Sequence, residues 1–180
     1  MSIVPEAFQA DLFRYLVLYK YGGVYNDIGH IYMRNINEMI YEDDEFVISR
    51  DFYPHKHCYI YNAFIAIYPK HPILKAIIDL VIKNVNNKYY GGNPLEPTSP
   101  GACGHAFNIF FNNPITQNIN SGFYIINNFK IRMYEYPGVY IRNGTIAYIK
   151  TKFDGYYELM YTKQKKIRYS DLWNQRKIYR

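Results

Sequence analysis

Residues 19–30 read "YKYGGVYNDIGH", and this stretch divides the start of the chain into a helix and a strand. Gly22 and Gly23 follow a run that holds no proline or glycine after Pro5, which predicts a helix over residues 5–21 that ends at the glycine pair. A short β-type run over residues 23–28 comes next and contains Asp27. An acid at the tip of a strand is either a turn residue or part of a ligand site, and the residues alone leave both interpretations open.

Apolar patterning and turn residues place the other predicted elements. Helices are expected over residues 71–87 and 101–111, separated by a loop over 89–100 that is rich in glycine and proline. Strands are expected over 31–33, 46–49, 58–67, 123–126, 129–134, 139–142 and 145–150. The chain of 180 residues shows no repeat and no linker. It therefore predicts one α/β domain over residues 1–180, with a β-rich, basic C-terminal part over about 122–180.

Composition narrows the class of protein. Hydrophobic residues make up 49% of the chain and charged residues 20%, which is typical of a globular protein and not of a disordered one.

No apolar run approaches the roughly 20 residues of a membrane-spanning helix, and the first residues do not form a signal peptide. Cys58 and Cys103 show no metal-ligand spacing. The expected location of the chain as given is the cytoplasm.

The net charge of +6 lies entirely in the C-terminal part. Residues 150–180 contain nine lysines and arginines against three acids, whereas residues 1–149 are balanced. The basic residues are Lys150, Lys152, Lys163, Lys165, Lys166, Arg168, Arg176, Lys177 and Arg180. Such a tail can contact nucleic acid, an anionic surface or a diphosphate ligand, or it can simply be solvated.

The first helix carries two charges in an apolar setting. Apolar residues cover most of its circumference, which predicts a buried helix. Asp11 and Arg14 lie at i and i+3 on one face. They either form a mutual salt bridge or mark a face that lines a pocket.

The segment "ADLFRYLVLYKYGGVYNDIG" (residues 10–29) resembles the signature of the family 32 glycosyltransferases. These are sugar-binding enzymes with a DXD motif, and they include initiating α-1,6-mannosyltransferases. Asp11, Arg14, Tyr25 and Asp27 fall on the pattern in register. Two further stretches are similar to family segments: "NAFIAIYPKHPIL" (62–74) and "EPTSPGA" (96–102). The stretch "YSDLWNQ" (169–175) is a loose match to a Ser-Trp site without its histidine.

The resemblance implies a GT-A-like nucleotide-sugar-binding fold with a DXD region over about residues 5–110. It implies an enzyme that moves a hexose from a nucleotide-diphosphate sugar to an acceptor glycan or protein, with retention at the anomeric carbon. Its catalytic residues would be Asp11, Arg14 and Asp27. Its donor-binding residues would be Asp11, Arg14, Tyr25, Asn26, Asp27, Asn62, Thr98 and Trp173. In these roles Asp11 accepts hydrogen bonds from sugar hydroxyls, Arg14 or a tail lysine stabilises the leaving diphosphate, and Trp173 closes over the phosphates.

Two departures from the family pattern bear on activity. Gly29 stands where the family has its second acid, so Asp27 alone would hold Mn²⁺ or Mg²⁺, with His30, Asp51 or water completing the ligand set. The chain also begins almost at the signature helix. The first βαβ unit of the fold is therefore either supplied elsewhere or absent from a truncated or degenerate relative.

Two alternatives to the enzyme stay open, one based on these departures and one on the basic C-terminal part. The first is a degenerate, non-catalytic relative that binds nucleotide sugar. The second is a protein whose basic tail binds nucleic acid or an anionic surface, with steep salt dependence and no role for Asp27. Nucleic acid is not an expected partner, because the sequence carries no nucleic-acid-binding motif.

Overall fold

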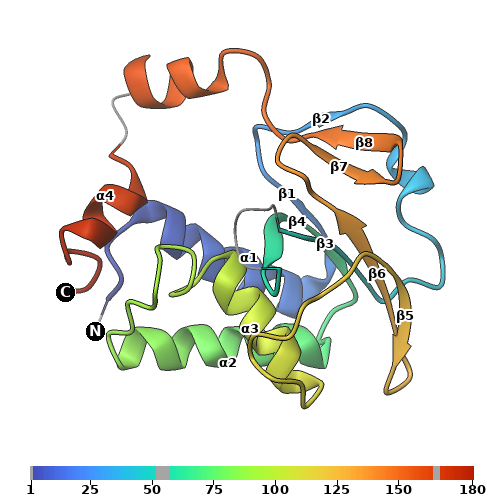
Figure 1. The fold of residues 1–180 in the computed structure, drawn as a ribbon, viewed down its shortest axis with the longest axis horizontal. Helices are drawn as coiled ribbons and strands as arrows, with labels where there is room; N and C mark the ends of the chain where they lie inside the picture. The colour runs from blue at the N-terminus through green and yellow to red at the C-terminus, as the bar shows by residue number, and fades with distance from the viewer. Residues whose placement is uncertain (1, 52–56, 164–166) are drawn as a thin grey trace.

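The computed structural model describes residues 2–51, 57–163 and 167–180, which form a mixed α/β structure (Figure 1). The elements are α1 (Glu6–Tyr21), β1 (Gly23–Asn26), β2 (Ile31–Tyr32), η1 (Ile36–Glu38), β3 (Phe46–Arg50), β4 (Ile60–Ile67), α2 (Pro72–Asn86), α3 (Pro100–Phe110), β5 (Gly122–Ile126), β6 (Phe129–Glu135), β7 (Tyr140–Asn143), β8 (Ile146–Lys150), η2 (Glu158–Lys163) and α4 (Tyr169–Asn174). The predicted α/β class is confirmed, and each helix and strand expected from the sequence is present within a few residues of its predicted bounds.

Eight strands form one curled sheet with the order β1-β4-β3-β6-β7-β8-β2, and β5 pairs with β6 beside this path. All the registered pairs are antiparallel except β3 with β6. Strand β1 is at one edge and runs antiparallel to β4 from Gly23 opposite Ile67 to Asn26 opposite Phe64. The edge position leaves the end of β1 accessible to the segments that follow β8.

Strand β4 is buried along its whole length, which explains its continuous apolar sequence. One of its faces packs against the layer of α1, α2 and α3, where Ile65 and Ile67 join the main hydrophobic core. Its other face lies in a second cluster that contains Phe64, Met39 and Ile149. The sheet is therefore covered on both sides near β4, and this rigid centre supports the end of β1.

Helix α1 is only half buried, which corrects the expectation of a helix enclosed on all sides. Phe13 is 66% exposed and Leu16 is 46% exposed. The buried face consists of Phe8, Asp11, Arg14, Tyr15 and Leu18. The helix lies at the margin of the helical layer, so its apolar residues on the outer side have no covering element in the described part of the chain.

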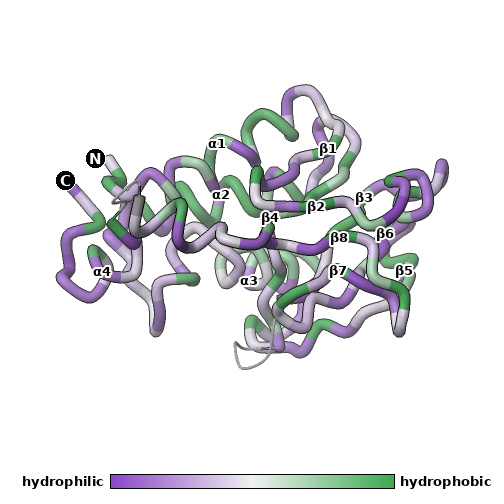
Figure 2. The backbone as a smooth tube through the Cα atoms, turned by 90° about the horizontal axis from the view of Figure 1, so that it is seen from above, coloured by the Kyte–Doolittle hydropathy of each residue, from purple (hydrophilic) through white to green (hydrophobic). Residues whose placement is uncertain are grey.

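The two ends of the chain lie side by side (Figure 1). The backbone N–H of Val4 donates to the Ile178 carbonyl at 2.9 Å, and a small cluster of Ile3, Phe8 and Ile178 forms beneath. In Figure 2 the trace just before the C-terminus is mostly purple, the colour of hydrophilic residues, and it ends close to the N-terminus. Within the described residues, no helix has both the length and the apolar character that a membrane crossing requires.

Candidate functional site

The Asp11 carboxylate is at the centre of a buried polar cluster between α1, β4 and the loop before α3. One oxygen, Oδ1, accepts from Asn62 Nδ2 at 2.9 Å and faces Arg14 Nη2 at 3.2 Å. The other, Oδ2, accepts from Thr98 Oγ1 at 2.8 Å and Ser99 Oγ at 2.5 Å. Burial raises the pKa of Asp11, and Arg14 together with the three neutral donors opposes that rise. The carboxylate therefore joins three separate segments.

Arg14 connects this buried cluster to the end of β1. Its Nη1 donates to the Asn62 carbonyl at 2.8 Å and contacts Asp27 Oδ1 at 3.4 Å. Its guanidinium lies 4.4 Å from the centre of the Tyr25 ring. Burial lowers the pKa of Arg14, but the charges of Asp11 and Asp27 outweigh this effect and raise it overall. The salt bridge expected between Asp11 and Arg14 is present, and Arg14 also reaches Asp27. That this face of the helix lines a pocket stays a prediction.

Asp27 is at the turn that follows β1. Its N–H donates to the Ala63 carbonyl at 2.9 Å, and its own carbonyl accepts from the His30 N–H at 3.1 Å. Asp27 is therefore a turn residue by its backbone. Its side chain is 28% exposed and has a separate role, because Oδ1 accepts from the Tyr25 hydroxyl at 2.9 Å. Tyr25 and Arg14 thus contact one carboxylate oxygen, and the other, Oδ2, faces Lys152 at 4.0 Å.

Asn26 and His30 stabilise the same turn from the other side. The Asn26 amide donates to the Asp27 carbonyl at 2.9 Å, so its oxygen is the acceptor for His30 Nδ1 at 2.7 Å. His30 Nε2 lies 3.0 Å from the Tyr61 hydroxyl. Burial lowers the pKa of His30 to about 4, and Lys152 and Arg14 add to this effect while Asp27 opposes it. His30 is therefore neutral near pH 7, with both ring nitrogens engaged.

Lys152 is a site residue that the family pattern did not single out. Its Nζ lies 4.0 Å from Asp27 Oδ2 and 4.4 Å from the centre of the Tyr156 ring. Burial lowers the pKa of Lys152, and Asp27 opposes this shift. The basic composition of the C-terminal part indicated that a lysine could lie near the ligand. The spacing of these lysines did not identify which one lies close to the end of β1. That placement depends on β8, which carries the following residues back to the turn after β1.

The structure brings together most of the residues that the resemblance indicated. Asp11, Arg14, Asn62 and Thr98 form the buried part of the cluster, and Tyr25, Asn26 and Asp27 form its more accessible part. Trp173 lies elsewhere: its Nε1 donates to the Tyr90 carbonyl at 2.7 Å, and its ring packs in the cluster of the chain ends. Its role over the phosphates stays a prediction.

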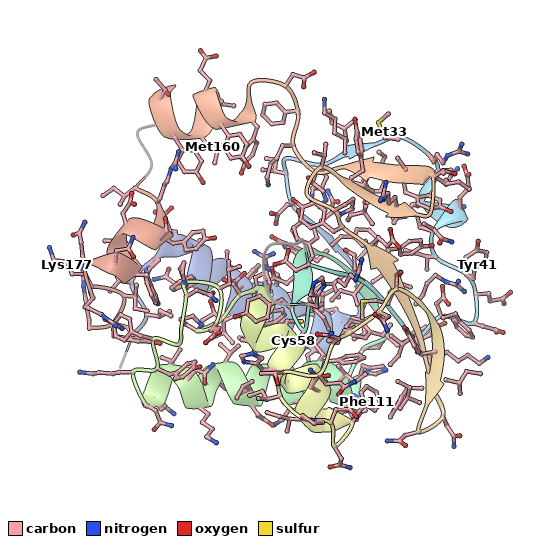
Figure 3. The ribbon with its side chains drawn as sticks, in the orientation of Figure 1. Met33, Tyr41, Cys58, Phe111, Met160 and Lys177 are labelled. Atoms are coloured by element: carbon pink, nitrogen blue, oxygen red, sulfur yellow. The ribbon has the colours of Figure 1, made fainter. Side chains whose placement is uncertain are left out.

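Among the residues that the structure describes, the basic side chains of the C-terminal part are spread over separate places on the molecule. Lys150 pairs with Asp154 at 2.7 Å, near β8, whereas the Arg176 guanidinium lies 4.5 Å from the centre of the Tyr90 ring, near α4. Figure 3 shows Lys177 projecting at the far end of the molecule from β8. Lys165 and Lys166 fall outside the described residues. Contact of the tail with an anionic surface stays a prediction.

The residues near Asp27 fit a divalent cation poorly. In the described ranges, no three His, Cys, Asp or Glu side chains lie close enough to hold a metal ion. Gly29 supplies no ligand, and the two ring nitrogens of His30 are engaged by Asn26 and Tyr61. Asp51 is buried at the end of β3, and its charge, like that of Asp27, contributes to the raised pKa of Tyr61. A hard cation requires several oxygen ligands, and Asp27 offers one carboxylate that already faces Lys152.

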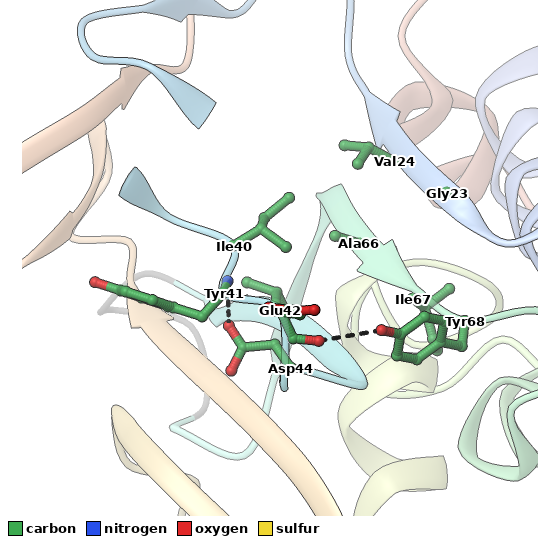
Figure 4. Close-up of a pocket in the computed structure, with 10 residues that line it drawn as sticks. Gly23, Val24, Ile40, Tyr41, Glu42, Asp44, Ala66, Ile67 and Tyr68 are labelled. Carbon is green, nitrogen blue, oxygen red and sulfur yellow. Dashed lines mark hydrogen bonds between the residues drawn. The ribbon is translucent and has the colours of Figure 1, made fainter. Parts of the chain in front are cut away.

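A hollow of about 310 Å³ lies away from this cluster (Figure 4). It is lined by Gly23, Val24, Ile40, Tyr41, Glu42, Asp44, Val47, Ala66, Ile67 and Tyr68. Two of its polar groups are already engaged, because the Asp44 carboxylate accepts from the Tyr41 N–H at 3.0 Å and the Tyr68 hydroxyl donates to the Glu42 carbonyl at 3.2 Å. Its lining includes none of the candidate site residues, so we do not assign the donor to it.

Residues 2–46 match the family model described as "glycosyltransferase sugar-binding region containing DXD motif". The match covers α1, β1, β2 and η1 and ends at the first residue of β3. It therefore includes Asp11, Arg14, Tyr25, Asn26 and Asp27, and it supports the general similarity to DXD glycosyltransferases. It gives no support to the narrower assignment to family 32 or to mannosyltransferases.

The chain was also compared with solved structures and curated proteins. A solved structure titled "PaToxG Glycosyltransferase" aligns with a TM-score of 0.48 and 25% sequence identity, over 58% of this chain and 35% of that chain. This chain thus spans well under two thirds of that protein's length. No curated protein gives a significant match.

Proposed function

We propose that the chain binds a nucleotide-diphosphate sugar at the Asp27 turn and transfers the sugar to an acceptor glycan or protein. The observation that carries the proposal is the arrangement at the end of β1. Arg14, Tyr25 and Asp27 lie inside the region that matches the DXD family model, and the first two contact one carboxylate oxygen of Asp27. Lys152, from outside that region, lies beside the other oxygen. A fixed carboxylate with two adjacent cations suits a ligand that combines sugar hydroxyls with a diphosphate.

The chemistry proposed for each residue follows from its position. Asp27 Oδ2, which points away from the Tyr25 hydroxyl, accepts a hydroxyl of the donor. Arg14 and Lys152 offset the charge that develops on the diphosphate as the sugar–oxygen bond breaks. Asp11 acts as a positioning residue, because its two oxygens receive four donors from the protein and hold Arg14 in place. A hexose donor, retention at the anomeric carbon and a GT-A-like fold are proposed with the activity, and they rest on the family resemblance.

The activity is tested by release of nucleoside diphosphate from UDP-glucose, UDP-N-acetylglucosamine and GDP-mannose, each with EDTA, Mn²⁺ or Mg²⁺. We expect release from at least one donor, slowed at least about tenfold in Asp27→Asn. Asp154→Asn is the matched control, because the Asp154 side chain is 96% exposed and pairs with Lys150 at 2.7 Å, away from Asp27 in the ion pairs of the described residues. Proton NMR of the product gives the anomeric configuration.

Binding without turnover is the second candidate function. Gly29 and the internal hydrogen bonding of Asp11 favour it, because both reduce the groups available to a reacting sugar. Donor binding that is lost in Asp27→Asn, with no release under any condition, would establish this alternative. Absence of both binding and release would overturn the proposal.

A further inference from the structure

We infer that Lys152 supplies the positive charge at the diphosphate position, in place of a divalent cation, so that the chain binds a nucleoside diphosphate without metal. This inference rests on the proposed function, because it assigns the ligand charge at the same site. It concerns a residue that comes from the segment after β8, more than a hundred positions from the matched DXD region.

The position of Lys152 is fixed by its neighbours on both sides. The Thr151 N–H and hydroxyl both donate to the Val139 carbonyl, each at 2.9 Å. The Phe153 N–H donates to the Gly29 carbonyl at 3.0 Å. These bonds tie the backbone around Lys152 to Val139, just before β7, on one side and to the turn after β1 on the other. The backbone of Lys152 is therefore held beside the turn, and from there the side chain brings its ammonium to 4.0 Å from Asp27 Oδ2.

Gly29 and Lys152 occupy connected space. A Cβ at Gly29 would lie 3.0 Å from Tyr156 Cε2 and 3.3 Å from Lys152 Cδ. The Cβ of an aspartate at this position would therefore make tight contacts with both side chains, and each would have to shift by a few tenths of an ångström. The space beside the missing second acid is thus filled by a lysine stem and by the aromatic ring on which its ammonium rests. A side chain at position 29 and the Lys152 stem would therefore compete for the same small volume.

The local charges leave Lys152 able to bind an anion. The Asp27 carboxylate is shared, since Oδ1 faces Arg14 at 3.4 Å and Oδ2 faces Lys152 at 4.0 Å. Within the described residues, the Lys152 ammonium has this one long ion pair and the Tyr156 ring, and no shorter hydrogen bond. Its side chain is 26% exposed, so it has lost much of its water yet remains reachable. A diphosphate oxygen would restore the hydrogen bonds that the ammonium lacks.

The test is calorimetric titration of UDP, GDP and inorganic pyrophosphate in EDTA and, separately, in Mn²⁺. The variants are Lys152→Gln, Lys152→Arg and the matched control Lys150→Gln, whose Nζ pairs with Asp154 at the surface. We expect binding in EDTA that weakens at least about tenfold in Lys152→Gln, which corresponds to about 1.4 kcal/mol. Lys152→Arg should retain most of the affinity, and Lys150→Gln should match the wild type. The midpoint of thermal unfolding checks that each variant is folded.

The outcomes separate this inference from the proposed function. If a nucleotide binds only with Mn²⁺ and Lys152→Gln leaves the affinity unchanged, the inference is wrong and the nucleotide site stands. If Lys152→Gln and Lys150→Gln weaken binding equally, the effect is one of net charge and the inference is also wrong. If neither nucleotide nor pyrophosphate binds under any condition, the inference and the proposed function both fail.

Discussion

At the Asp11 carboxylate, the amide of Asn62 is one of four donors that make a buried charge tolerable. Its Nδ2 contacts Asp11 Oδ1 at 2.9 Å and the Tyr15 hydroxyl at 2.6 Å, and Asn62 is only 5% exposed. A buried acceptor that loses its donor cannot be rescued by water, so its desolvation is no longer offset.

Asn62→Ala is therefore expected to lower the free energy of unfolding by about 1 to 3 kcal/mol, measured by urea denaturation. The matched control is Asn86→Ala on the exposed side of α2, where a small stabilisation is expected because alanine favours a helix. Equal stability of the Asn62→Ala variant and the wild type would contradict the role assigned to the cluster.

His30 makes the stability of the turn depend on pH. Its pKa falls from about 6.5 in an unfolded chain to about 4 in the structure, because burial disfavours the charged ring. Between these values the unfolded chain binds a proton that the folded protein does not bind. The free energy of unfolding should therefore decrease as the pH falls from about 6.5 toward 4.

Urea denaturation of wild type and His30→Gln at several pH values between 7 and 4 measures this contribution. We expect a shallower pH dependence in His30→Gln than in the wild type. The same slope in both proteins would show that His30 is not buried in a neutral form.

Helix α3 and strand β4 approach each other closely through a glycine. An ideal Cβ at Gly104 would lie within 2 Å of the carbonyl oxygen of Cys58, just before β4. Figure 3 shows Cys58 at the centre of the molecule, beside α3. Alanine can fit here only if the helix moves away from the sheet, which would also shift the Thr98–Ser99 segment at the start of the helix.

Gly104→Ala should therefore destabilise the protein by about 1 to 3 kcal/mol, although alanine is the better helix former. Thermal or urea unfolding measures the effect. Ile109→Ala serves as the control on the same helix, because Ile109 is 50% exposed and its loss should change stability little. A stabilised Gly104→Ala variant would show that helix propensity outweighs the close approach.

Local sequence signals located the strands and the longer helices, and they missed the short helices. The glycine pair after α1, the Pro72 start of α2 and the Asn143-Gly144 turn between β7 and β8 are encoded in neighbouring residues. By contrast, η2 and α4 are short helices without a strong local signal. Helix α4 packs through Leu172 and Trp173 on the cluster of the chain ends, and such tertiary contacts are invisible in a local pattern.

The candidate site was predictable where its residues are close together in the sequence, and not where tertiary contacts bring distant residues together. Asp11, Arg14, Tyr25 and Asp27 lie within one segment, so the family pattern could identify them together. Lys152 reaches the site only because β8 pairs with both β7 and β2, and a single sequence does not report that pairing. The outer face of α1 was predicted to be buried because an apolar residue can be recognised in a sequence, whereas the absence of a covering element cannot.

Over the whole molecule, the site combines a buried anchor with an accessible turn. The anchor joins α1, β4 and the loop before α3 through Asp11, and the turn joins the end of β1 to the segment after β8 through Asp27 and Lys152. These segments are distant in sequence, so the geometry of the site depends on the complete fold. Variants that loosen the anchor should therefore lower nucleotide affinity as well as stability, even where they do not face the ligand.

The most direct test of the central claim is calorimetric titration of UDP and GDP against wild type, Asp27→Asn and Asp154→Asn, each with EDTA and with Mn²⁺. We predict binding of at least one nucleotide to wild type and Asp154→Asn, and binding that is at least about tenfold weaker in Asp27→Asn. Identical binding by all three proteins, or no binding of either nucleotide in any condition, would contradict a nucleotide-sugar site at Asp27.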